Sequence, residues 1–103
     1  MADRELKIKS GVLKRLSKEL AFYKKEVTQL EQKLSDAAAD QRRLNDLLEE
    51  SRAASAAVQT RASSAFEDLQ AILDSASEDI ANSEEYAAAK QLIAEVGDSV
   101  SSH

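Results

Sequence analysis

The feature that most constrains this chain is a regular alternation of apolar residues in its first third. Apolar side chains recur every three or four residues, at Leu6, Leu13, Leu16, Leu20, Tyr23, Val27, Leu30 and Leu34. At about 100° per residue, these side chains share one side of a helix. The pattern predicts a helix over residues 5–34, about 45 Å long. Because a single apolar stripe of this length is unstable in water, the rest of the chain has to cover it.

The opposite side of the same helix carries positive charge. Four lysines fall within about 40° of one another and about 170° from the apolar stripe. An arginine and a phenylalanine lie beside them, and no acid enters this sector before Asp36. A solvated face that keeps the molecule soluble is one interpretation. The single sign of charge and the apolar ring outside the core favour partner binding instead. The predicted partner-binding residues are Lys7, Lys14, Arg15, Lys18, Phe22 and Lys25.

Gly11 lies on this basic side, inside the predicted helix. Glycine in a helix interior costs about 1 kcal/mol relative to alanine. One interpretation is a mild kink or a late start of the helix. The other is that a partner approaches the backbone closely at this point.

The remaining chain predicts two further helices. A second stripe with 4-3 spacing runs from Leu44 to Ala76 and has a small, polar middle, where Ser51 and Ser55 can bond back to the preceding turn. It predicts a helix over residues 41–75. A third helix over residues 83–96 follows a turn at residues 75–83. Its predicted boundaries are an Asn82–Glu85 capping box and a terminating Gly97. Its apolar face is Tyr86, Ala89, Ile93, Val96 and Val100.

These elements predict an all-α fold, an antiparallel up-down-up three-helix bundle with coiled-coil-like packing, formed by residues 1–103 as a single domain. The chain has no Pro and only two Gly, which favours long helices over sheets. The first turn is expected at residues 35–40, with Asp36 or Asp40 as the N-cap of the second helix. An unbroken helix through this turn, giving an extended coiled coil, is the alternative. The predicted core comprises Leu16, Leu20, Tyr23, Val27, Leu48, Val58, Leu69, Ile72, Tyr86 and Ile93.

Charge and composition narrow the classes of function. The net charge is −5, with +4 on residues 1–34 and −9 on residues 35–103. The acidic total argues against nucleic-acid binding, and the basic first helix suggests an acidic partner. The chain has no Cys, no membrane-length apolar run, and one His, the terminal His103. No catalytic, cofactor-binding or metal-ligating set is recognisable, so we expect neither an enzyme nor a cofactor.

Several segments resemble one family, that of tubulin-specific chaperone A, or tubulin-folding cofactor A. Residues 4–16, RELKIKSGVLKRL, look like its N-terminal signature nearly residue by residue, and Tyr23 and Glu26 continue the match. Weaker matches are Glu50-Ser51-Arg52, Leu69-Gln70-Ala71-Ile72-Leu73 and Glu84-Glu85-Tyr86. The short, glycine-free first linker and the Ala/Ser-rich middle of the second helix depart from the family pattern.

The resemblance implies a folding cofactor that binds and stabilises β-tubulin monomers on the pathway to α/β-tubulin heterodimer assembly. It implies no nucleotide hydrolysis, and contact through helix faces more than through turns. We expect a cytoplasmic monomer associated with cytoskeleton assembly, with β-tubulin as partner and neither nucleic acid nor membrane. The alternative is a helical scaffold or trafficking module that pairs with partner helices.

Overall fold

The structure is a computed structural model that describes residues 2–36 and 40–101. Its helices are α1 (Ala2–Asp36), α2 (Gln41–Asp74), α3 (Glu78–Ala81) and α4 (Glu84–Ser101). No strand occurs within these residues, so the all-α prediction is confirmed. The prediction of three helices is corrected to four, because the segment predicted as the second turn contains the single-turn helix α3.

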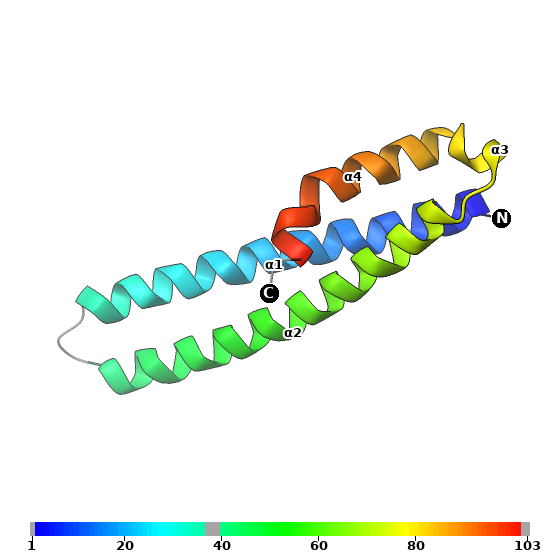
Figure 1. The fold of residues 1–103 in the computed structure, drawn as a ribbon. Coiled ribbons are helices and arrows are strands. Elements are labelled where there is room, and N and C mark those ends of the chain that lie inside the picture. The colour runs from blue at the N-terminus through cyan, green and yellow to red at the C-terminus, as the bar shows by residue number, and fades with distance from the viewer. Residues whose placement is uncertain (1, 37–39, 102–103) are drawn as a thin grey trace.

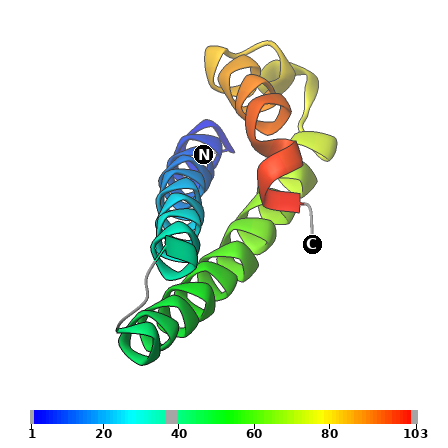
Figure 2. The same cartoon turned by 90° about the vertical axis from the view of Figure 1, so that its left-hand side faces the viewer.

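The long helices form a narrow rod of 61 × 19 × 17 Å. Helix α2 runs back alongside α1, and α4 then returns over the N-terminal half of α1 and the C-terminal half of α2 (Figure 1). The end-on view in Figure 2 shows the end of α4 beside α2, and α4 contacts both of the longer helices. Since α4 has 18 residues against 35 in α1, the described part of the far end of the rod consists of α1 and α2.

The apolar stripes of α1, α2 and α4 meet in one core. Its buried members are Leu6, Leu13, Leu16, Leu20, Val58, Ala62, Ala65, Leu69, Leu73, Ala89 and Val100. Five of the ten predicted core residues are buried: Leu16, Leu20, Leu48, Val58 and Leu69. Four others pack half-buried against the cluster: Tyr23, Ile72, Tyr86 and Ile93. The tenth, Val27, is half-buried and lines a groove between α1 and α2.

Helix α1 is continuous through Gly11, so the interpretation of a late helix start is wrong. It ends at Asp36, which excludes an unbroken helix through residues 35–41 and also excludes Asp36 as an N-cap. Asp40 holds the N-cap position of α2 with a left-handed φ of 61°, but its side chain makes no capping hydrogen bond. Asp tolerates this backbone conformation better than most residues. Residues 37–39 of the predicted turn lie outside the described residues.

Both predicted boundaries of the last helix are corrected. The Oγ of Ser83, not Asn82, accepts the N–H of Tyr86 at 3.1 Å, so serine caps α4. Gly97 does not end α4, which continues to Ser101. A Cβ at Gly97 would lie 3.6 Å from Cε2 of Phe66, so this glycine packs against the ring of an α2 residue. A Cβ at that distance would make an ordinary contact, so α4 has room for a methyl group at this position.

Candidate functional site

The structure places all six predicted partner-binding residues on the exposed side of α1. We call this set, Lys7, Lys14, Arg15, Lys18, Phe22 and Lys25, the α1 outer face. It spans 18 helical steps, or about 27 Å. The Phe22 side chain is 62% exposed, although phenylalanine ordinarily contributes to a core. The helical period alone brings these residues together, because they all belong to one element.

The cations of the α1 outer face are not neutralised within the described part of the chain. The ion pairs found there are Lys9–Asp68, at 3.8 Å, and Arg52–Glu31, at 2.8 Å. Both use cations outside the α1 outer face, and both join α1 to α2. The five cations of the face thus present positive charge to solvent, on a molecule whose net charge is −5.

Phe22 is supported by a neighbouring ring. Its centroid lies 5.5 Å from that of Tyr23, with the ring planes at 77°, an edge-to-face arrangement. Tyr23 is half-buried and packs against the core cluster. The exposed ring consequently lies against a side chain that is half-buried and packed on the core cluster. Such pre-ordering lowers the entropy that binding would cost at this position.

The prediction did not include Ile8, which is 56% exposed on α1. Ile8, Arg15 and Phe22 are spaced by seven residues, so they recur on one side of the helix. Gly11 lies between them, and a Cβ built on it would meet nothing within 4 Å. The heptad spacing was the sequence signal that could have identified Ile8.

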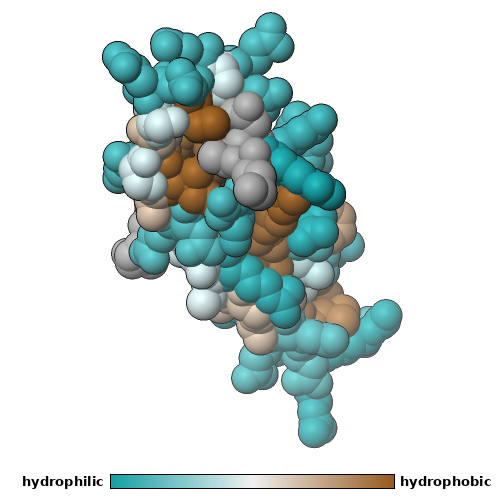
Figure 3. All heavy atoms as spheres, turned by 90° about the vertical axis from the view of Figure 1, so that its right-hand side faces the viewer, coloured by the Kyte–Doolittle hydropathy of each residue, from teal (hydrophilic) through white to brown (hydrophobic). Residues whose placement is uncertain are grey.

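A shallow groove follows the junction of α1 and α4 beside this face. One part, of about 260 Å³, is lined by Lys7, Ser10, Glu84, Glu85 and Ala88. The next, of about 310 Å³, is lined by Ser10, Gly11, Lys14, Ala88, Gln91, Leu92 and Glu95. One wall is therefore basic and the other acidic. Figure 3, seen from the α3 end of the rod, shows apolar patches between the hydrophilic side chains that dominate that end of the molecule.

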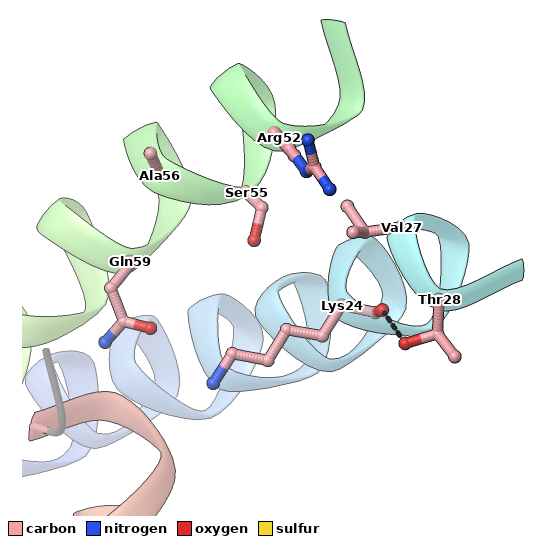
Figure 4. Close-up of a pocket in the computed structure, with 7 residues that line it drawn as sticks. All are labelled: Lys24, Val27, Thr28, Arg52, Ser55, Ala56 and Gln59. Atoms are coloured by element: carbon pink, nitrogen blue, oxygen red, sulfur yellow. Dashed lines mark hydrogen bonds between the residues drawn. The ribbon is translucent and has the colours of Figure 1, made fainter. Parts of the chain in front are cut away.

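A larger groove, of about 570 Å³, opens between α1 and α2 where α4 ends (Figure 4). Its lining residues are Lys24, Val27, Thr28, Arg52, Ser55, Ala56 and Gln59. The Oγ1 of Thr28 donates to the carbonyl of Lys24 in its own helix at 3.0 Å. Lys24 Nζ donates to the carbonyl of Ser99 at 3.3 Å, which brings a positive charge to the C-terminal end of α4. The surface of this groove is mostly apolar, although several of its lining residues are polar, and the prediction did not identify it.

The end of α4 is fixed against α2 by two further hydrogen bonds. The Val100 carbonyl accepts Nε2 of Gln59 and Oγ of Ser63. A helix C-terminus leaves carbonyls without intrahelical partners. Side chains of α2 satisfy one of them here, so the groove has a defined boundary on the α4 side.

Among residues 2–36 and 40–101, no group of three or more His, Cys, Asp or Glu side chains could hold a metal ion. His103 lies outside these residues. No helix in the described part of the chain is long and apolar enough to cross a membrane.

Comparison with known proteins gives a consistent result over most of the chain. The family model described as tubulin binding cofactor A matches residues 1–93. Tubulin-specific chaperone A of Homo sapiens is 38% identical over 102 residues, covering 90% of this chain and 94% of that protein. The protein of the same name from Gallus gallus is 35% identical over 105 residues, covering 93% and 96%. The solved structure of human tubulin chaperone cofactor A matches with a TM-score of 0.86 at 34% identity, covering 94% of this chain and 99% of that one. The chain thus belongs to the tubulin binding cofactor A family.

Proposed function

We propose that this chain is a folding cofactor that binds and stabilises β-tubulin monomers before α/β-tubulin heterodimer assembly. Membership of the family supports a tubulin-folding cofactor role. The observation that supports the more specific proposal, binding of β-tubulin monomers, is the α1 outer face. Within the described residues it has five cations without an ion pair and one aromatic ring that contacts a neighbouring ring. In this proposal the three long helices act as one bundle domain, in the cytoplasm and as a monomer.

Charge on this face favours a fast encounter with an acidic partner surface. Complementary potentials raise association rates more than they raise final affinity, and added salt screens the effect. Residues 35–103 carry a net charge of −9, so they repel the same partner surface that the first helix attracts. This separation of charge orients the approach, with α1 leading.

The test is to measure association and dissociation rates with β-tubulin at two salt concentrations. The variant carrying Lys14→Glu and Lys18→Glu should associate more slowly than the wild-type protein and show a weaker salt dependence. The matched control is Arg42→Glu with Arg43→Glu, an equal change of charge at exposed positions at the start of α2. Circular dichroism checks that both variants remain helical. Equal association rates for the two variants and the wild-type protein would refute a role for the α1 outer face.

The second candidate function is a scaffold or trafficking module that pairs with partner helices. The open groove between α1 and α2 favours it, because among the described residues its lining comes from these two helices alone. Molar mass in solution separates the candidates, since the rod shape is already elongated as one chain. A monomer by light scattering, together with capture of β-tubulin from cytosol, supports the cofactor. A dimer that captures no tubulin supports the scaffold.

A further inference from the structure

We propose that the exposed side of α1 is a helix-docking seam, and that its occupant is an amphipathic, acidic α-helix of the tubulin partner. The seam consists of Ile8, Gly11, Arg15, Lys18, Phe22 and Lys25. This inference rests on the proposed function and adds the kind of partner element that is recognised. It also adds two residues, Ile8 and Gly11, to the contact surface.

The spacing of the seam is that of a helix-packing surface. Its residues follow one another at intervals of three, four, three, four and three. The buried stripe of α1 from Leu13 to Leu34 alternates in the same way and packs against α2 and α4. Such 3-4 alternation keeps a row of side chains facing a neighbouring helix. Helix α1 therefore has two helix-packing rows. Within the described chain, α4 only flanks the outer row, at the groove that Gly11 lines, and no atom lies within 4 Å of a Cβ built on Gly11.

Apolar contact is available at two positions of the seam. Ile8 and Phe22 are 56% and 62% exposed, and they are two of the three large exposed hydrophobic residues in the described chain. They are 14 residues apart, or about 21 Å along the axis. Single exposed apolar residues are common on protein surfaces. Two of them in one heptad register, on a helix that already buries its other side, indicate a contact of about four turns.

Gly11 lies between these two anchors. It is exposed, it has helical rather than positive φ, and no atom lies within 4 Å of the Cβ that another residue would add there. Neither backbone conformation nor internal packing therefore requires glycine, which costs about 1 kcal/mol here relative to alanine. The consequence is a notch between Ile8 and Arg15, into which a large side chain of a docked helix can insert.

Charge selects the occupant. Arg15, Lys18 and Lys25 lie in the seam, Lys7 and Lys14 lie along its edge, and none forms an ion pair with the described chain. Flanking charges determine which helices pair and in which orientation. A second copy of α1 would place like charges together, which disfavours a self-pair through this surface. An amphipathic helix with Asp or Glu beside its apolar row satisfies both the anchors and the cations.

The first experiment uses Gly11→Gln. Glutamine favours helix more than glycine does, so the urea midpoint should stay equal or rise. Filling the notch should nevertheless weaken binding to purified β-tubulin by at least about tenfold. Ala57→Gln, at an exposed position on α2, adds bulk away from the seam and should leave binding unchanged. Wild-type affinity in Gly11→Gln would overturn the seam.

The second experiment identifies the occupant. A photo-crosslinking amino acid in place of Ile8 should join to a peptide of β-tubulin that is helical and rich in Asp and Glu. The same amino acid in place of Leu47, which is 39% exposed on α2, should not. A crosslink to a strand or to a basic segment would overturn the proposal, as would binding of the wild-type protein to phosphatidylserine vesicles that competes with tubulin. If the wild-type protein captures no β-tubulin, the proposed function and the seam fail together. If the wild-type protein captures β-tubulin, but Gly11→Gln binds with wild-type affinity and no crosslink forms from position 8, the seam alone fails.

Discussion

The hydroxyl of Ser51 donates a hydrogen bond of 2.9 Å to Oε1 of Glu26 and so joins α2 to α1. This contact is separate from the hydrogen bonds that attach the end of α4 to α2. Ser51 is 8% exposed, so folding removes its hydroxyl from water. Sequence reasoning predicted that this serine bonds to the preceding turn of its own helix, and that prediction is wrong. The small side chain lets the two helices approach, and the carboxylate of Glu26 supplies the acceptor.

We expect Ser51→Ala to lower the free energy of unfolding by about 0.5–1.5 kcal/mol, because it removes a part-buried hydrogen bond. Glu26→Gln should cost less, since its amide oxygen can still accept. Urea unfolding followed by circular dichroism measures both. Ser17→Ala is the control, because that exposed hydroxyl bonds the carbonyl of Lys14 in its own helix. Equal midpoints for the Ser51 and Ser17 variants would contradict a role for the contact between helices.

Leu20→Ala should lower the free energy of unfolding by roughly 2–5 kcal/mol, since it truncates a core side chain. Leu20 is 1% exposed. Lys18→Ala, two residues earlier on the exposed side, should change stability by less than about 0.5 kcal/mol. The two urea midpoints are the measurement. If they shift equally, the assignment of the buried and exposed sides of α1 is wrong.

Gly97→Ala should raise the free energy of unfolding by up to about 1 kcal/mol, because alanine favours the helix interior. The added methyl group would lie 3.6 Å from the Phe66 ring, an ordinary contact distance. Thermal unfolding by circular dichroism checks this result. Gly97→Leu is the matched comparison and should be destabilising, since its larger side chain would displace the ring. A gain of stability with leucine would show that Phe66 does not limit the space.

Phe22→Ala should mainly speed dissociation from β-tubulin, because it removes apolar contact formed in the complex. The effect on folding should be small, since the ring is 62% exposed. Dissociation after a jump to excess competitor gives the rate. Phe66→Ala is a useful contrast, because that ring packs against the core and its loss should reduce stability. An unchanged dissociation rate in folded Phe22→Ala would remove this ring from the interface.

The periodicity of apolar residues was enough to predict those features that depend only on the helical repeat. The 3-4 spacing of leucines predicted α1, its buried side and its basic side, because a helix repeats every 3.6 residues whatever its neighbours. The same rule predicted the second helix over residues 41–75, and the structure has it at Gln41–Asp74. The candidate binding residues could be grouped for this reason alone, since all lie on one helix.

Predictions failed where two neighbouring residues could both occupy the N-cap position, or where a contact between distant residues determined the structure. Asn82 and Ser83 are both good caps, and the structure selects Ser83. Gly97 has the sequence character of a helix end, but its place opposite Phe66 depends on how α4 packs on α2. Ile8 was not predicted, because the outer face was defined by its positive charges and not by the seven-residue spacing that links Ile8 to Arg15 and Phe22. None of these outcomes follows from local propensity.

Because α4 is short, the two ends of the rod should differ in local stability. Amide protons in the α1–α2 end should exchange with solvent through small local openings, since fewer buried contacts must break there. Residues 7–25 of α1 lie mostly alongside α4, whose last turn is attached near Lys24. The surface proposed to meet tubulin is therefore carried by the slowly opening part of the rod. Local opening at the α1–α2 end can therefore occur while the geometry of that surface stays intact.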